Sequence, residues 1–487
     1  MSALTKTQVP GNSATGEAAR LRAGEVSALE LANTSIDRAA EVEPRINAIS
    51  WERFEEARAE AAAIDRGELP PGVSADAPFL GVPILLKDHR CSAAGQENRT
   101  GTVALTAERR TWNVDSHVYR SLRRLGFVVL GRTTSPEFAT AFVTESVASG
   151  VTRNPISLGH TSGGSSGGSA SAVAAGVVSV AHATDGGGSI RVPASTCGLV
   201  GLKPSRGRLS VGPTAAESWG GATVEGVLVR TAQDAAAVTS GMARPFSGDP
   251  YVAPGRLPAA CPRLDQLLSI GVMDRAPGGD AFASTEVSSV LNAVAGVLAD
   301  HGHRVEPVHP EALDEDYQSR FEIMMAADVE LLARSVEEVA GRPFAVGELA
   351  PRNERIRELA GRMAAVDYLE ARHWLEAWGY RFAQWWEGGA DVLVLPTLGG
   401  LPAAAGVDPR NDADIMDRVR LMQPMTSFAN VAGLPAVSLP LGASAEGLPI
   451  GIQFVAPLGR EDVLLALAAF FEESGPWFGP AQLGLEI

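Results

Sequence analysis

Short apolar runs alternate along the chain with stretches that keep a helical period. The apolar runs are brief and bounded by turn residues, as is typical of buried strands, whereas the longer stretches space their apolar positions three or four residues apart. The predicted strands are residues 79–86, 127–130, 177–183, 270–273 and 303–305, and the predicted helices lie within residues 17–66, 115–125, 170–176 and 287–300. This alternation predicts an α/β fold.

Between residues 311 and 389 the alternation gives way to long helical stretches that are rich in aromatic residues. Phe382, Trp385 and Trp386 belong to this segment, and two interpretations of them stay open. They pack a helical insert onto the core, or some of them line a bulky, apolar substrate pocket. The first is the commoner use of aromatic side chains at helical spacing.

Strand patterns return after the insert, and a helix at residues 462–473 follows them. The returning strands are residues 391–396, 436–440 and 449–455. Because no repeat or long linker interrupts the chain, we predict one domain over residues 1–487. Its parts are N-terminal helices (1–78), a core (79–310), a helical insert (311–390) and a C-terminal return to the core (391–487).

Composition and charge exclude several classes of function. The 487 residues are 45% apolar and carry a formal net charge of −16, which argues against nucleic acid or an anionic membrane as partner. Three cysteines do not make a disulfide framework, and no ligand spacing predicts a metal. Residues 1–6 lack the apolar centre of a signal peptide, and no run approaches the roughly 18 apolar residues of a membrane span. We expect a cytoplasmic protein.

A candidate nucleophile, Ser189, follows three consecutive glycines, Gly186, Gly187 and Gly188. Glycine allows the backbone to approach a substrate closely, so successive N–H groups can converge on the oxygen of a carbonyl under attack. A serine at the end of such a turn is placed to attack the same carbonyl. Its hydroxyl needs a base that removes the proton.

Lys87, at the end of the apolar run 79–86, is the best candidate for that base. Burial disfavours the ammonium form and lowers the pKa of a lysine, so that its amine can accept a proton. The alternative is a structural ion pair of Lys87 with Asp88 or Asp185. No histidine has a comparable setting, and His182 reads as a residue of a buried strand.

The segment Gly163–Ser169 supplies two more serines, Ser165 and Ser166, either of which can relay a proton between Lys87 and Ser189. The same segment satisfies G-x-S-x-G, the nucleophile elbow of α/β-hydrolases, but residues 154–160 before it read as a loop instead of the strand that an elbow requires. It is not a phosphate-binding P-loop, because no lysine follows it.

Together these segments resemble the amidase signature family. The strongest resemblance runs from Gly163 to Ser210 and includes Asp185–Ser195 and Cys197–Arg208. Weaker matches, such as Lys87-Asp88 and Asn430–Ala436, extend over almost the whole chain, except around residues 311–360. The family implies the amidase signature fold, a central mixed β-sheet sandwiched between helices, here with a helical insert.

The resemblance also implies roles for individual residues. Ser189 matches the nucleophile, Ser165 a bridging serine preceded by a cis peptide bond, and Lys87 the base, so that an acyl-enzyme forms without any cofactor. Backbone N–H groups of residues 186–189 match the oxyanion hole. Ser166, Asp185 and Arg191 match positions that orient the site. Gly186 departs from many relatives, which have a larger residue there, and we expect this to loosen the loop or widen the mouth of the site.

The expected activity is hydrolysis of C–N bonds in neutral amides, with cyclic amide oligomers, aryl amides, carbamates and esters as open possibilities. Thr161 and residues 181–185 look most like the branch of 6-aminohexanoate cyclic-dimer hydrolases and urethane-cleaving relatives. Residues 137–146, with Phe138, Thr140 and Phe142, are expected to face the substrate together with part of the insert.

Two other functions remain as alternatives. The chain can be the glutaminase subunit of a tRNA-dependent amidotransferase, which would need partner subunits, or a relative that binds without catalysis. The intact lysine and serines weigh against the second. The expected partner is a small-molecule amide or carbamate, with no nucleic acid and no membrane, and a homodimer is left open.

Overall fold

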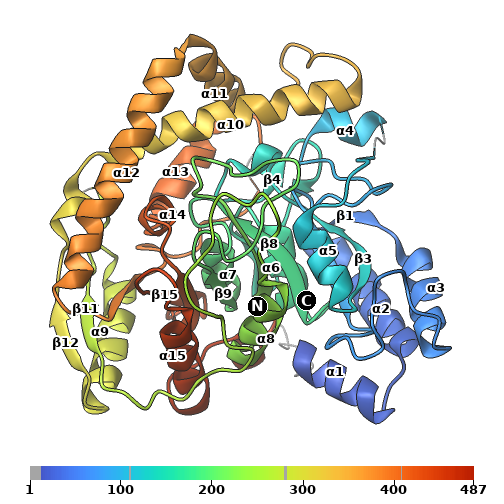
Figure 1. Ribbon diagram of the computed structural model, residues 1–487, viewed down its shortest axis with the longest axis horizontal. Coiled ribbons are helices and arrows are strands. Elements are labelled where there is room, and N and C mark those ends of the chain that lie inside the picture. Colours follow the sequence, from blue (N-terminus) through green and yellow to red (C-terminus); the bar gives the residue numbers. More distant parts are fainter. Residues whose placement is uncertain (1–12, 109–110, 279–281, 407) are drawn as a thin grey trace, which may run out of the picture.

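A single large β-sheet runs through the computed structural model of the chain, which describes residues 13–108, 111–278, 282–406 and 408–487 (Figure 1). Its strands, in spatial order, are β1 (Ile49–Glu52), β3 (Val128–Thr133), β2 (Pro83–Lys87), β8 (Val180–Asp185), β10 (Val224–Val229), β9 (Val200–Lys203), β14 (Ala436–Ala443), β15 (Pro449–Val455), β13 (Val392–Pro396), β11 (Ser269–Val272) and β12 (Arg304–Pro307). The sheet is mixed. Strand β2 pairs in parallel with β3 and β8, whereas each neighbouring pair in the series β8, β10, β9, β14 and β15 is antiparallel. The predicted mixed α/β sheet is therefore confirmed.

Helices cover both faces of the sheet, because successive apolar residues of its strands point to opposite sides. Ile84 and Leu86 of β2 join one apolar core, whereas Leu85 between them joins another. The helices of the first core are α1 (Ala14–Ala23), α5 (His117–Arg124), α8 (Ala232–Met242), α9 (Thr285–Asp300) and α15 (Glu461–Ser474). Those of the second core are α2 (Ala28–Ile46), α3 (Phe54–Asp65), α6 (Gly167–Ala174) and α7 (Arg191–Cys197).

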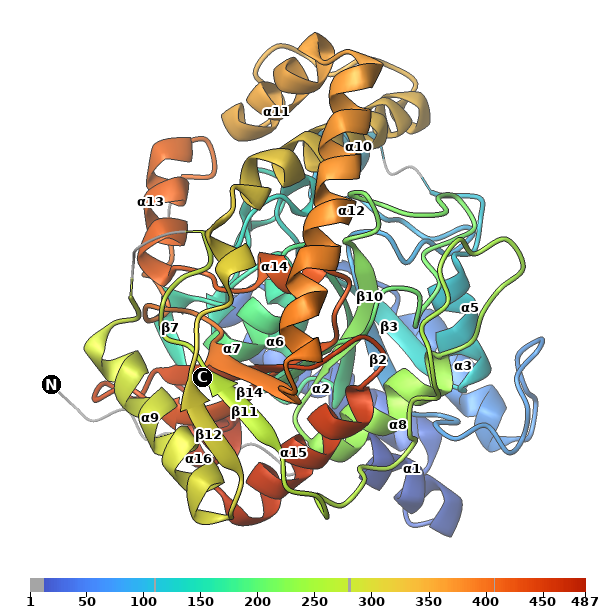
Figure 2. The ribbon, with the colours of Figure 1, turned by 60° about the vertical axis from the view of Figure 1, so that its left-hand side comes forward.

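The predicted insert consists of α10 (Tyr317–Ala340), α11 (Pro351–Arg362) and α12 (Ala365–Glu387), which Figure 2 shows rising from the body of the molecule. Phe382, Trp385 and Trp386 of α12 pack against one another and, with α14 (Ser427–Val431), against strands β13 and β15. Neither of the two cavities described below is lined by these three residues. The packing interpretation of the aromatic residues is thus confirmed.

Short elements complete the described part of the chain. They are α4 (Val103–Glu108), α13 (Asp412–Met422), α16 (Pro480–Leu483), the 3₁₀ helices η1 (Glu137–Ala139) and η2 (Glu311–Asp314), and two small hairpins, β4 (Glu145–Ser146) with β5 (Gly150–Val151) and β6 (Arg153–Asn154) with β7 (Ser157–Thr161). The prediction of a loop over residues 154–160 was wrong in part, since β7 lies there. However, β7 pairs with β6 outside the main sheet, so it is not the strand of a nucleophile elbow.

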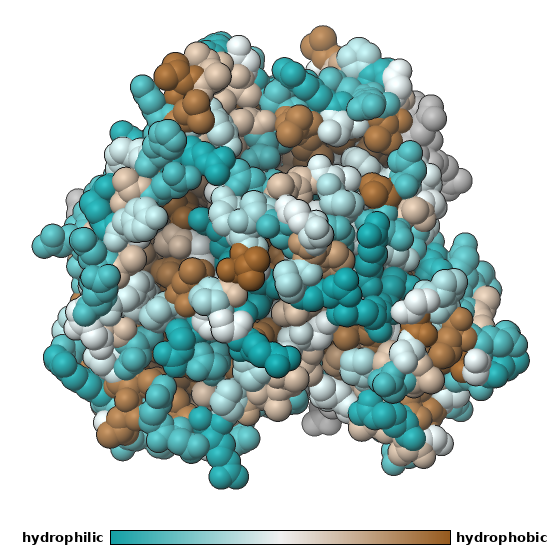
Figure 3. All heavy atoms as spheres, viewed as in Figure 1, coloured by the Kyte–Doolittle hydropathy of each residue, from teal (hydrophilic) through white to brown (hydrophobic). Residues whose placement is uncertain are grey.

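The face of the molecule in Figure 3 is mostly polar, with separate apolar patches, in keeping with the net charge of −16. No helix within the described residues is both long and apolar enough to cross a membrane. Residues 1–6, for which we expect no signal peptide, lie outside the described residues.

Candidate active site

Lys87, the last residue of β2, lies fully buried in the middle of the molecule. Its Nζ donates hydrogen bonds to Ser165 Oγ at 2.7 Å and to Thr184 Oγ1 at 2.8 Å. Ser165 belongs to the turn before α6, and Thr184 to β8, the neighbour of β2 in the sheet. Three segments far apart in sequence thus meet at one amine.

The surroundings of Lys87 favour a neutral amine. Burial lowers the pKa of Lys87 to about 7, although the carboxylates of Glu225 and Asp185 favour its charged form. Among the described residues, neither Asp88 nor Asp185 forms an ion pair with Lys87: Asp185 pairs with Arg191, and Asp88 accepts a hydrogen bond from the backbone of Arg99. The alternative of a structural ion pair is therefore wrong.

The serine-glycine turn brings Ser165 to the lysine through a cis peptide bond between Gly164 and Ser165. The predicted position of this bond is confirmed. Ser166 instead contacts the backbone of β8, where its hydroxyl donates to the carbonyl of Thr184 at 3.3 Å. Ser165, not Ser166, is thus the serine in contact with Lys87.

Asp185 and Arg191 close the loop that holds the three glycines. Asp185 ends β8, Arg191 begins α7, and their buried side chains form two hydrogen bonds of 3.0 Å. Burial opposes the charge of Asp185, but Arg191, with Lys203 and Asn430, outweighs it and lowers the pKa of Asp185 to about 2. Asn430 of α14 also donates to the backbone carbonyl of Asp185 at 2.9 Å. The ion pair therefore fixes both ends of the loop.

Residues 186–189 form the glycine loop, and their backbone amides have no hydrogen-bond acceptor among the described residues. None of these four N–H groups donates a hydrogen bond to another described residue, whereas those of Ile190 and Arg191 approach the carboxylate of Asp185. Gly188 has φ +144°, and a Cβ there would lie 2.1 Å from Thr426 Oγ1. Glycine is thus required at 188, and the loop leaves several donors open to a ligand.

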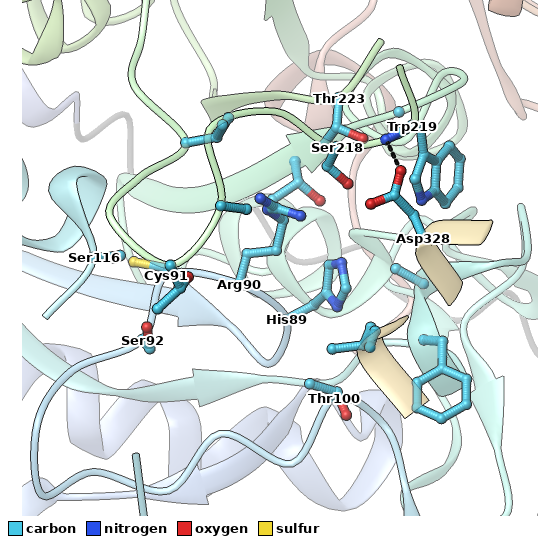
Figure 4. Close-up of a pocket in the computed structure, with 18 of the residues that line it drawn as sticks. His89, Arg90, Cys91, Ser92, Thr100, Ser116, Ser218, Trp219, Thr223 and Asp328 are labelled. Carbon is cyan, nitrogen blue, oxygen red and sulfur yellow. Dashed lines mark hydrogen bonds between the residues drawn. The ribbon is translucent and has the colours of Figure 1, made fainter. Parts of the chain in front are cut away.

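Two cavities meet at Ser189. The smaller, of about 180 Å³, mixes polar and apolar side chains and contains Ser165 and Thr184 beside Ser189. Figure 4 shows its His89, Arg90 and Asp328 side chains, which come from the loop after β2 and from α10. The larger, of about 590 Å³, is lined mainly by apolar side chains from α10, α11 and α13. They include Phe321, Met325, Ile356, Leu359 and Met416.

The three predicted substrate-facing residues all reach these cavities. Phe138 lines the smaller cavity, and Thr140 and Phe142 line the larger one. Part of the insert lines both cavities, as the sequence led us to expect.

Of the two expectations for Gly186, the wider mouth was wrong, because the space that its missing side chain leaves is filled. The looser loop stays a prediction. A Cβ at residue 186 would lie 2.8 and 2.9 Å from two carbons of the Trp219 indole ring. Trp219 lies at the boundary of the two cavities and lines both. The glycine therefore makes room for an indole ring and does not widen the mouth.

Sequence reasoning missed several residues of the site. Glu225, Thr426 and Trp219 carried no signal of their own, since each acts through a contact between distant segments. Thr184 stood inside residues 181–185, which resemble one branch of the family, but nothing indicated its contact with Lys87. Asn430 stood inside a segment that matched the family, and that was its only signal. His182 is confirmed as a buried strand residue, with its Nε2 2.8 Å from Glu225 Oε2.

The described residues contain no cluster of three or more His, Cys, Asp or Glu side chains that could hold a metal ion. The absence of a metal and of a cofactor stays a prediction.

The mixed sheet, the buried lysine and the open amides define a class of α/β enzyme, hydrolases of amide C–N bonds with the amidase signature fold. The chain belongs to the family described as Amidase, which matches residues 30–465.

Named relatives agree with this assignment. The 6-aminohexanoate-cyclic-dimer hydrolase of Pseudomonas sp. (strain NK87) is 37% identical over 487 residues, covering 95% of each chain. A solved structure of 6-aminohexanoate cyclic dimer hydrolase complexed with substrate has a TM-score of 0.89 at 34% identity, covering 97% of this chain and 99% of that one. A bacterial aryl acylamidase of the amidase signature family has a TM-score of 0.87 at 25% identity, with 97% and 98% covered.

Proposed function

We propose that the chain hydrolyses amides through a triad of Ser189, Ser165 and Lys87. Neutral Lys87 accepts the proton of the Ser165 hydroxyl, which in turn takes the proton of Ser189 as the Ser189 oxygen bonds to the carbonyl carbon. The observation that carries the proposal is the 2.7 Å contact between Lys87 Nζ and Ser165 Oγ, in the cavity that also holds Ser189.

The carbonyl oxygen becomes an oxyanion, which the amides of Gly186, Gly187, Gly188 and Ser189 stabilise. Donors that are held in place before the reaction are worth about 100- to 1000-fold each in rate. The C–N bond then breaks as the relay returns a proton to the leaving nitrogen, and an ester of Ser189 remains. A water molecule gives its proton to the same relay, attacks the ester and releases the acid.

Ser166, Asp185 and Arg191 orient this machinery without contacting the reacting atoms. Ser166 ties the serine turn to β8, and the Asp185–Arg191 pair holds the glycine loop. Phe138, Thr140 and Phe142 are proposed to contact the substrate.

The proposed substrates are neutral amides with an apolar part, including cyclic amide oligomers and aryl amides, and we extend the proposal to carbamates and esters. The relatives named above support the two amide classes, and the apolar side chains of the larger cavity support the neutral character. We further propose that the chain acts without nucleic acid or a membrane as partner and is cytoplasmic. All three cysteines are free thiols, which is consistent with that location. A homodimer stays a prediction.

Covalent labelling tests the proposal. A fluorophosphonate probe should modify wild type at Ser189, and Ser189→Ala should neither react with it nor turn over a panel of aryl amides, cyclic amide oligomers and carbamates. Ser195→Ala is the matched control, because Ser195 lies on the adjacent helix α7 outside both cavities.

Labelling at another residue, or equal turnover by wild type and Ser189→Ala, would overturn the proposal. Turnover that appears only after partner subunits are added would favour the glutaminase alternative.

A further inference from the structure

Trp219 separates the two cavities at Ser189, and its position depends on Gly186. The indole ring takes the space that any side chain at residue 186 would occupy. The backbone N–H of Trp219 donates to the carboxylate of Asp328 on α10, as Figure 4 shows. The ring also meets Phe321 of α10 edge-on, with centroids 5.9 Å apart. Contacts from two directions therefore hold the indole at the boundary.

The proposed proton relay decides which half of a substrate enters which cavity. Since Ser165 returns the proton to the leaving nitrogen, that nitrogen must come within about 2.6–3.2 Å of its hydroxyl. Ser165 lines the smaller cavity and is absent from the walls of the larger one. The substituent on the nitrogen therefore extends into the smaller cavity, and the acyl substituent is left with the larger one, beside Gly187.

Both cavities have apolar walls in part, and in the smaller one Val329 and Leu332 belong to them, but the smaller cavity adds a group of buried polar side chains of its own. In the smaller cavity, Glu225 and Arg90 form an ion pair of 3.3 Å. His89 Nδ1 and Asn98 Oδ1, both buried, have no hydrogen-bond partner among the described residues. Buried polar atoms without partners favour a ligand that carries hydrogen-bonding groups. The larger cavity, roughly three times the volume, offers mainly apolar side chains, although Glu322, Arg352 and Arg355 are also among its lining residues.

We propose that Trp219 is a specificity-determining wall that directs a compact, polar leaving amine into the smaller cavity and an extended apolar acyl group into the larger one. The inference rests on the proposed function, since the relay through Ser165 gives the direction. The preferred substrate class is therefore amides of medium-length apolar acids with small amines that carry a hydrogen-bonding group.

A grid of four substrates tests the wall: acetyl and octanoyl amides of ethanolamine and of 2-aminonaphthalene. Wild type should prefer octanoyl ethanolamide in kcat/KM. Trp219→Ala should raise kcat/KM for octanoyl naphthylamide relative to octanoyl ethanolamide by about tenfold or more, a change on the scale of a resized apolar pocket. Its rate of deacylation from the common octanoyl-enzyme should change less than twofold, because the amine has then left.

Phe142→Ala is the matched control, because Phe142 lines the larger cavity alone. It should change the preference between acetyl and octanoyl and leave the preference between the two amines in place. A Trp219→Ala enzyme that shifts the acyl preference instead, or neither preference, would overturn the inference. Loss of Ser189 labelling would instead reject the proposed function, so the two failures are distinguishable.

The contact with Gly186 gives a second readout. Gly186→Ala should lower kcat/KM strongly in wild type, because the new Cβ meets the indole, but only slightly in a Trp219→Ala background. If the losses in kcat/KM of the two single variants simply add in the double variant, the contact between residue 186 and Trp219 does not hold the indole in place, and this part of the inference is overturned. If Trp219→Ala folds poorly by circular dichroism, Trp219→Phe should show a smaller shift in the same direction, and no shift in a folded Trp219→Phe would count against the wall.

Discussion

Two buried lysines show that burial alone does not make a base. Burial lowers the pKa of both Lys87 and Lys203 to about 7. Lys87 Nζ contacts two hydroxyls and lies beside the smaller cavity, whereas Lys203 Nζ donates to the carbonyl of Pro204. The two lysines therefore differ in position. Among the described contacts, the amine of Lys87 reaches the hydroxyl of a serine, Ser165, and the amine of Lys203 does not.

We predict that Lys87→Met lowers kcat by about 100- to 10,000-fold, the usual contribution of a general base. In wild type, kcat/KM should fall as pH drops below about 7, because protonation of Lys87 removes the acceptor, and reach a plateau above it. Measuring kcat/KM from pH 5 to 9 on one aryl amide checks both statements.

Lys203→Met provides the control for this profile, since its amine is equally buried and touches no serine in the described contacts. It should retain the inflection near pH 7. An inflection that disappears in Lys203→Met, or survives in the residual activity of Lys87→Met, would contradict Lys87 as the base.

At the scale of elements, the turn between β8 and α7 is built by one buried ion pair. Asp185 and Arg191 are both fully buried, and Arg191 also donates to the side chains of Asn430 and Gln453, which lie on α14 and β15. These contacts connect the glycine loop to the far half of the sheet. Removing one partner would leave the other charge buried and uncompensated.

Arg191→Met is therefore expected to lower the free energy of unfolding by about 3–5 kcal/mol and to abolish activity. Because the pKa of Asp185 in the folded protein is lowered to about 2, the stabilisation by the ion pair is complete above the pKa of the unfolded chain, near 3.8. This stabilisation is lost as the pH falls through 2. Urea unfolding at pH 7 measures the cost. Arg304→Met, which removes an exposed pair with Glu306, should cost about 0–1 kcal/mol. Equal costs for the two variants would contradict the role of the buried pair.

The sequence predicted elements well where apolar pattern and local propensity agree. The returning strands and the helices of the insert lie close to their predicted ranges. The strand predicted over residues 79–86 begins only at Pro83, because the apolar residues before Pro83 form a turn that is buried like a strand. Strands β9 and β10 and helices α7 and α8 were not predicted, since small residues and glycines give no clear period.

The residues of the site also fall into two groups: those that the local sequence indicated and those that only the folded structure shows. Lys87, Ser165 and Ser189 were found from residue chemistry and resemblance, because each stands in a distinctive local segment. Trp219 was not, since nothing near residue 219 indicates that its ring packs onto Gly186, 33 positions earlier in the printed sequence. Contacts of this kind exist only once the chain has folded.

At the scale of the whole molecule, the sheet interleaves the two halves of the chain. Strands β14, β15 and β13, from the C-terminal part, lie between β9 and β11, which come from before the insert. Helix α12 of the insert packs onto the same sheet through Phe382, whose ring meets that of Phe428 on α14 at 5.7 Å. The single domain stays a prediction, and the interleaved strands are the reason to test it.

A single domain predicts that the insert and the sheet unfold together. Four of the eight tryptophans lie on α12, so tryptophan fluorescence reports mainly on the insert, whereas far-UV circular dichroism reports on the whole chain. We expect the two thermal midpoints to coincide, because the contact of α12 with α14 and β13 ties the insert to the core. Phe428→Ala should lower both midpoints by the same amount, in line with the loss of about 3–5 kcal/mol for a buried phenylalanine. A fluorescence transition several degrees below the dichroism transition would mean that the insert is a domain of its own.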